Sequence, residues 1–125
     1  MPEPPATPTL QQRCAAVAAE QRGFQDLCGA TQNWIMWAAH DSIASSFELF
    51  AGGAQYWEWI NTDKHAESWM RDYLRRWGGG PSDPVGAAVR YTTLVLIVET
   101  LRAHGLEAEM PERPWWMPKE GAPDA

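Results

Sequence analysis

One stretch of this 125-residue chain specifies a helix together with both of its ends. Asp83 is a favoured capping residue, and Pro84 suits the first helical position because its missing N–H has no helical partner there. About 20 residues later, Gly105 follows His104 and forms a typical helix stop. Residues 94–98 are apolar on every side of a helical wheel, although their β-branched members would also suit a strand. The two caps decide for a helix that lies centrally in a bundle or in an oligomer interface.

The same reasoning predicts two helices in the first half of the chain. Thr9 is the expected cap of a helix that runs to about Cys28, and Thr31 is the expected cap of a helix that ends at Gly52-Gly53. The residues expected on the apolar face of the first helix are Leu10, Cys14, Val17, Gln21, Phe24 and Cys28. The apolar stripe expected on the second consists of Met36, Ala39, Ile43, Phe47 and Phe50.

A further helix is expected over residues 63–77, with Asn61 or Thr62 as its cap and a Gly-Gly-Gly-Pro stretch after it. Ala66, Met70, Tyr73, Leu74 and Trp77 form its apolar side, and two acid–base pairs at i,i+4 spacing suit a solvated outer face. Residues 54–60 fit either a short strand or a continued helix.

The sequence therefore predicts one all-α domain, a small bundle of about four helices over residues 9–105. A head, residues 1–8, carries four prolines and is expected to be disordered or extended. The tail, residues 106–125, is rich in proline and tryptophan, and its prolines forbid regular helix. We expect Trp115 and Trp116 to dock on the bundle or on a neighbouring subunit, because a solvated pair of tryptophans favours aggregation.

Eight tryptophans are more than a 14.0 kDa core needs. Tryptophan is enriched at contact surfaces, since its flat body buries a large area while its N–H can still find a partner. Trp34, Trp37, Asp41 and Glu48 lie opposite the apolar stripe of the second helix, so aromatic anchors and acids are predicted to share one outward face. This face is a candidate for the docking of a protein partner or for a dimer interface, and burial within a monomer is the alternative.

The net charge of −6 and the isoelectric point of about 4.9 disfavour nucleic-acid binding, which depends on basic patches. An acidic surface suits a basic protein partner, or it only confers solubility. The N-terminal residues lack the pattern of a signal peptide, and the longest apolar run is too short to span a bilayer, so we expect a cytoplasmic protein without a membrane segment. Both cysteines are expected to be reduced core residues.

Residues that could carry chemistry do not form a recognisable set. His40 and Asp41 are adjacent, and His65 and Glu67 are two residues apart, whereas ligands on a helix converge at i,i+3 or i,i+4. A nucleophilic set of Cys28 with His40 and Asp41 would need an exposed thiolate. We therefore predict no metal site, no cofactor and no catalytic residues.

Taken together, these features favour a non-enzymatic protein-binding module, a homo-oligomeric adaptor or inhibitor that docks on a larger protein. Short acidic helical proteins rich in aromatic residues occur among phage- and plasmid-borne inhibitors, which is an analogy only. The alternative is a small-molecule binder or an enzyme with an aromatic-lined pocket between helices. The partner-binding residues predicted here are Trp34, Trp37, Asp41, Glu48, Trp115 and Trp116.

Overall fold

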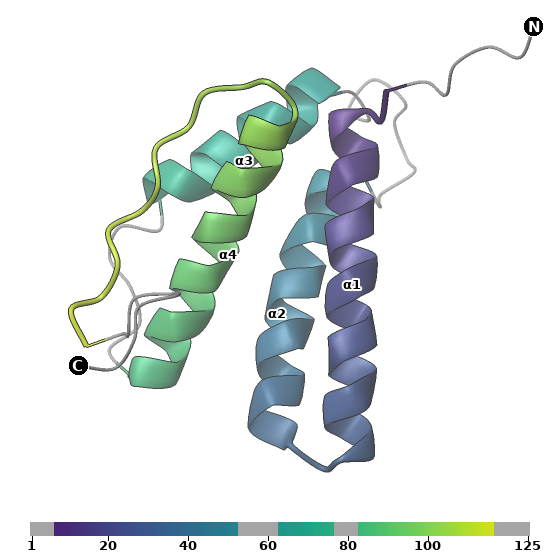
Figure 1. Cartoon of the computed structure of the whole chain (residues 1–125), viewed down its shortest axis with the longest axis vertical. Helices are drawn as coiled ribbons and strands as arrows, with labels where there is room; N and C mark the ends of the chain where they lie inside the picture. The colour runs from purple at the N-terminus through teal and green to yellow at the C-terminus, as the bar shows by residue number, and fades with distance from the viewer. Residues whose placement is uncertain (1–6, 53–62, 77–82, 117–125) are drawn as a thin grey trace, which may run out of the picture.

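The computed structural model describes residues 7–52, 63–76 and 83–116, and this part of the chain contains four helices and no strand. Figure 1 shows α1 (Leu10–Ala30) and α2 (Trp34–Phe50) side by side as a long antiparallel hairpin. The 20-residue α4 (Pro84–Ala103) runs beside this hairpin over much of its length, and the shorter α3 (Asp63–Arg76) packs near the end away from the α1–α2 connection. The predicted all-α bundle is thus confirmed.

The two ends of α1 are specified by local hydrogen bonds. The Thr9 hydroxyl accepts from the Gln12 N–H at 3.1 Å and the Gln12 side chain accepts from the Thr9 N–H at 2.9 Å, so the predicted cap is confirmed as a capping box. Thr31 does not cap α2, as the sequence had suggested. It ends α1 instead, and its hydroxyl donates back to the Leu27 carbonyl at 3.1 Å.

The cap of α2 is Asn33, whose side chain accepts from the Met36 N–H at 3.2 Å. The intervening Gln32 has a φ of 59°, which lets the chain reverse between two helices with only three residues. The rest of α2 follows the expectation closely, because the helix ends at Phe50 and Gly52 then adopts a φ of 80°.

The predicted ends of α4 are confirmed. The Asp83 carboxylate accepts from the Gly86 N–H at 2.7 Å, and Gly105 has a φ of 80° directly after the last turn. Thr93 and Thr100 are buried in this helix, and each hydroxyl donates to the carbonyl one turn earlier, at 2.8 and 2.7 Å. These bonds let polar, β-branched residues lie in an apolar helix without a lost hydrogen bond.

By length and composition α4 could also cross a membrane, although the longest apolar run by itself had looked too short. The central helices of bundles share these two properties. In this structure Leu94, Ile97, Val98 and Leu101 of α4 are buried against the other helices. The expected cytoplasmic location stays a prediction.

The hydrophobic core lies where all four helices meet. It is made by the first half of α1, the second halves of α2 and α4, and α3, and its buried members are Leu10, Cys14, Ala18, Ile43, Phe47, Phe50, Ala66, Met70, Leu94, Ile97 and Leu101. The Phe50 ring packs edge-on against Tyr73 at a centroid distance of 4.9 Å. Burial raises the pKa of the Cys14 thiol to about 12, so this cysteine is protonated and acts as a small core residue.

The other end of the α1–α2 hairpin extends beyond this core. Phe24 and Met36, both expected on apolar stripes, are exposed near this end, where the first turns of α4 lie beside those of α2. The connection between α1 and α2 and the first turn of α2 form this end of the molecule, which we call the hairpin tip.

Several sequence predictions lie outside the described residues. They concern residues 1–6 of the head, the strand-or-helix stretch 54–60, the cap at Asn61 or Thr62, Trp77 with the glycines after it, and residues 117–125 of the tail.

Candidate binding surface

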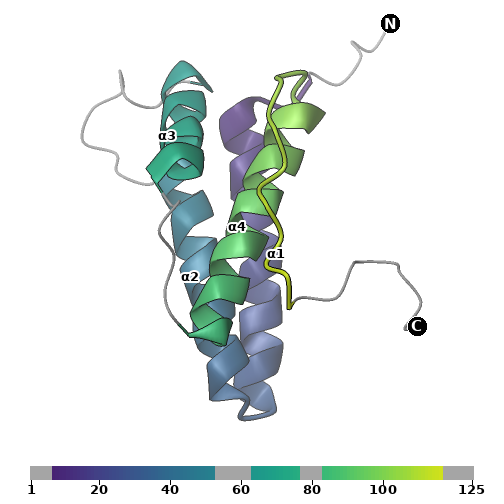
Figure 2. The same ribbon diagram turned by 90° about the vertical axis from the view of Figure 1, so that its left-hand side faces the viewer.

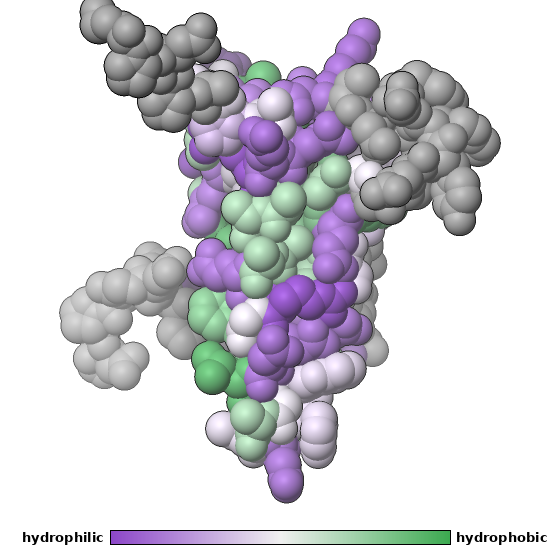
Figure 3. Space-filling model, turned by 90° about the vertical axis from the view of Figure 1, so that its right-hand side faces the viewer, coloured by the Kyte–Doolittle hydropathy of each residue, from purple (hydrophilic) through white to green (hydrophobic). Residues whose placement is uncertain are grey.

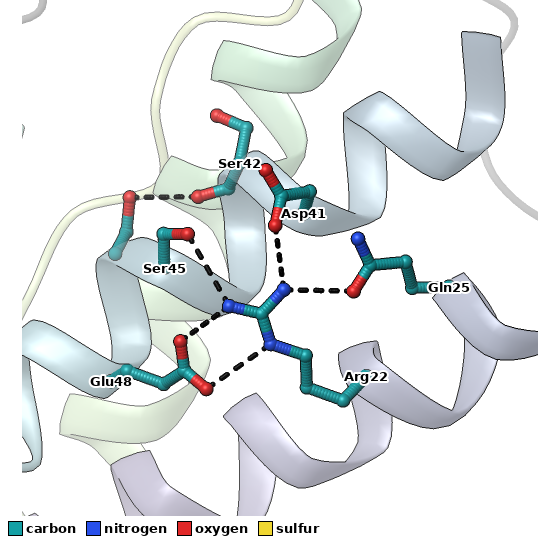
Figure 4. A network of polar contacts seen from close by, with 7 residues as sticks. Arg22, Gln25, Asp41, Ser42, Ser45 and Glu48 are labelled. Carbon is teal, nitrogen blue, oxygen red and sulfur yellow. Dashed lines mark hydrogen bonds and ion pairs between the residues drawn. The ribbon is translucent and has the colours of Figure 1, made fainter. Parts of the chain in front are cut away.

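An arginine on α1 holds the two acids that had been expected on the outward face of α2. Figure 4 shows Arg22 reaching across the hairpin to α2. Its guanidinium donates to Asp41 at 2.6 Å and forms two bonds to Glu48, at 2.5 and 3.1 Å. It also donates to Gln25, beside it on α1, at 2.8 Å. The acids thus belong to the contact between α1 and α2.

The electrostatics of this network follow from its geometry. Hydrogen bonds from Arg22 hold the pKa of the Glu48 carboxyl below its ordinary value. The same bonds, first to Glu48 and then to Asp41, raise the pKa of the Arg22 guanidinium above its ordinary value. Because both carboxylates already have a charged partner, this part of α2 does not present two free acids to another protein. On the face expected to point outward, the Asp41 and Glu48 side chains remain 45% and 47% exposed, while Ala44 between them is fully buried.

Trp34 and Trp37, in contrast, remain exposed at the hairpin tip. Their exposed fractions are 60% and 38%, and their rings meet edge-on with centroids 6.3 Å apart. Trp37 lies directly over Gly29 of α1, where a Cβ atom would come within 3.3 Å of the ring. The missing side chain at Gly29 therefore lets Trp37 pack closely on α1.

A second apolar surface lies between α2 and α4. It is a groove of about 370 Å³, which we call the α2–α4 groove. The residues that line it are Ile35, Met36, Ala39, His40 and Ile43 from α2, Pro84, Val85, Ala88, Val89 and Thr92 from α4, and Trp116 from the tail. The Phe24 ring of α1 lies 5.4 Å from the ring of His40, which extends the apolar surface onto α1.

The described part of the tail returns along α4. In Figure 2, residues 106–116 run down beside this helix toward its first turn. Trp116 is 41% exposed and lines the α2–α4 groove as well as a cavity of about 550 Å³ beside Leu74, Arg90 and Tyr91. Trp115 is 92% exposed. The docking predicted for the pair is thus seen for Trp116 and not for Trp115.

The side chains considered for catalysis are not brought together. His40 Nδ1 is 2.7 Å from the buried Gln21 side chain, whereas Asp41 pairs with Arg22. Cys28 is half-buried near the end of α1. Within the described ranges, no group of three His, Cys, Asp or Glu side chains is placed to hold a metal ion.

The exposed apolar residues of the groove were missed in the sequence. Ile35 and Val85 each occupy the second position of a helix, and neither belongs to the stripe that faces the core. The sequence did contain an indication of the groove, because each residue is a large apolar side chain in a first turn that does not face the core. This indication could be interpreted only with the knowledge that α2 and α4 begin near each other.

Comparison of the chain with protein-family models, with curated proteins and with solved structures gives no match. The functional argument therefore depends on the geometry of this chain.

Proposed function

We propose that this protein is a non-enzymatic protein-binding module, an adaptor or inhibitor that docks on a larger protein through the Trp34–Trp37 pair. One observation carries this proposal. Two exposed tryptophan rings meet edge-on at the hairpin tip, away from the core, and one of them packs on Gly29. Rings of this kind are frequent binding anchors, because a rigid aromatic side chain loses little entropy on contact.

The chemistry expected of the partner follows from the pair and from the net charge. Trp34 and Trp37 would bind in an apolar pocket of the partner. The net charge of −6 favours a basic surface around that pocket. The acids contribute through the overall field of the molecule, since Asp41 and Glu48 are paired with Arg22. Trp115, which is almost fully exposed, is a second possible anchor on the tail.

The alternative of an aromatic cage for a small ligand has less support in the described residues. Such a cage needs three or four rings around one cavity. Of the tryptophans that the structure describes, Trp116 alone lines the α2–α4 groove. Three rings line the cavity of about 550 Å³, those of Tyr91, Trp115 and Trp116, but Trp115 is 92% exposed and does not enclose it.

The test compares partner capture by the wild type with capture by Trp34→Ala, Trp34→Phe and Leu49→Ala. Leu49 is a matched control because it is an exposed apolar residue at the opposite end of α2. The protein captured by the wild type from cells that express this chain is purified, and its Kd is measured directly. Loss of a buried anchor costs ~2 kcal/mol, so Trp34→Ala should weaken the Kd about 30-fold. Leu49→Ala should leave the Kd unchanged, and Trp34→Phe should lie between.

A folded Trp34→Ala variant that binds as tightly as the wild type would show that the pair is not the anchor. Charge reversal at Asp41 and Glu48, by substitution with lysine, is a poor test of this surface. Both changes would place positive charge against Arg22 and loosen the contact between α1 and α2. Salt is the better probe of electrostatics, because association with a basic partner should slow as ionic strength rises.

A further inference from the structure

The α2–α4 groove has projecting apolar rims on both sides. Ile35 on α2 is 65% exposed and Val85 on α4 is 51% exposed, and the groove lies between them. None of the described residues that line it is Asp, Glu, Lys or Arg. In the space-filling view of Figure 3, hydrophilic colour dominates the side of α1, and the strongest hydrophobic colour lies at its lower left edge, toward the hairpin tip.

The exposed apolar area at this groove is close to what a protein interface requires. Five residues on and beside it expose on the order of 500 Å², more than half of the ~800 Å² that each partner of a standard interface buries. They are Phe24, Ile35, Met36, Val85 and Trp116. The remaining lining residues of both helices, several of them half-buried, add to this area.

The described residues of the lining include no Asp, Glu, Lys or Arg, which indicates what kind of surface can cover them. Such a lining gains nothing from a charged partner and selects an equally uncharged surface. This chain carries such a surface itself. Its net charge of −6 opposes self-association in general, and contact between uncharged surfaces adds least to that repulsion. A two-fold contact uses the same patch on both copies, so the patch must contain projections as well as a hollow. The groove and its two rims meet this requirement.

We propose that the α2–α4 groove is covered by the same groove of a second copy, in a two-fold dimer in which the rims at Ile35 and Val85 of each copy enter the hollow of the other. The Trp34–Trp37 pair lies on a different edge of α2, where it packs on Gly29 of α1. The dimer therefore leaves this pair free for another protein, and its existence does not depend on the function proposed above.

Light scattering after size exclusion tests the dimer with the full chain and three acidic substitutions. The wild type at tens of micromolar should give about twice the chain mass of 14.0 kDa. Ile35→Asp and Val85→Asp should each weaken the dimer Kd by ~100-fold or more, because a two-fold interface would bury the unpaired charge twice. Trp34→Asp should leave the dimer intact.

The three substitutions are matched in their effect on the fold. Trp34, Ile35 and Val85 all lie in the first turn of a helix, where an added carboxylate is favoured by the helix dipole. Circular dichroism should therefore show three folded proteins. Hydrogen exchange gives a second measurement, since the first turns of α2 and α4 should exchange faster in Val85→Asp than in the wild type.

Three results would overturn the proposal. One is a wild type that is monomeric at tens of micromolar. Another is a dimer that survives both groove substitutions, or that is lost with Trp34→Asp and not with them. The third is a small apolar molecule that co-purifies with the chain and is displaced by Ile35→Asp, as seen by native mass spectrometry, because the groove of about 370 Å³ is within the size range of ligand pockets.

Discussion

Arg22 shows how a single residue changes the meaning of a sequence pattern. On a helical wheel, Asp41 and Glu48 lie opposite the apolar stripe of α2 and look like free surface acids. The structure gives both a cation from the neighbouring helix, at 2.6 and 2.5 Å. The sequence could not show this pairing, because it requires the register of α1 against α2. Arg22 also lies on a polar part of α1 where its own periodicity gives no reason to single it out.

Glu48 should make the stability of the protein depend on pH in the acid range. Its folded pKa lies below its ordinary value of about 4.5, so the unfolded chain binds its proton more readily. The stabilisation is therefore present above pH 4.5 and is lost as the pH falls through the folded pKa. We expect the free energy of unfolding in urea to decrease with acidification below this value. In Glu48→Gln this decrease should be smaller.

The control for this prediction is Arg22→Met, which keeps the apolar stem and removes the donor. It should flatten the pH dependence in the same way as Glu48→Gln, and the double variant should show no further flattening. At neutral pH the substitution of Arg22 should lower stability by ~1 kcal/mol, since the network is partly exposed. Equal acid sensitivity of the wild type and both variants would contradict the role given to Glu48.

At the level of elements, helix ends were the most predictable feature of this chain. Thr9 and Asp83 cap their helices as expected, and the stops at Gly52 and Gly105 adopt the positive φ that favours glycine. The signals for helix ends depend on only a few adjacent residues, so they can be recognised in the sequence. The cap of α2 was placed two residues early because Thr31 and Asn33 are both good capping residues, and only the turn geometry decides between them.

Asp63 joins elements in a way that no local signal indicates. From the first turn of α3, its carboxylate accepts from the N–H groups of Leu10 and Gln11 at 3.0 and 3.2 Å, and so caps α1. It also lies 3.6 Å from His104 at the end of α4. One side chain therefore links the ends of three helices.

Asp63→Ala should lower the free energy of unfolding by ~1–2 kcal/mol, because it leaves two amides of α1 without their acceptor. Thermal denaturation followed by circular dichroism should show a fall in Tm of several degrees. Asp72→Ala is the matched control, since it removes ion pairs made within α3 alone and should cost ~0.5 kcal/mol or less. Similar losses in the two variants would mean that Asp63 does not join the helices.

At the level of the whole molecule, the sequence indicated a bundle but not its shape. Periodicity identified the core residues Ile43, Phe47 and Met70, since each lies on a regular apolar face. It did not indicate that the core lies toward one end of the hairpin, nor that Phe24 and Met36 at the other end are exposed. Which helices cover which length of a hairpin depends on packing between elements, and that information is distributed over the whole chain.

The tail provides the last prediction, because its two tryptophans are neighbours with opposite environments. Trp116 is 41% exposed and lines two cavities beside α4, whereas Trp115 lines one of them and is 92% exposed. Burial of an aromatic side chain stabilises by ~25 cal/mol per Å², so Trp116→Ala should lower the free energy of unfolding by ~1–2 kcal/mol. Trp115→Ala should change it by ~0.5 kcal/mol or less, as is usual for exposed sites.

Both substitutions are best measured at low protein concentration, so that any contact between copies does not contribute to the difference. Urea denaturation at neutral pH measures the difference in the free energy of unfolding directly. The pair is its own control, because the two variants lose the same side chain at adjacent positions of one segment. If Trp115→Ala proves as costly as Trp116→Ala, the tail packs differently from the arrangement along α4 shown in Figure 2. If neither substitution lowers the free energy of unfolding, Trp116 does not stabilise the bundle.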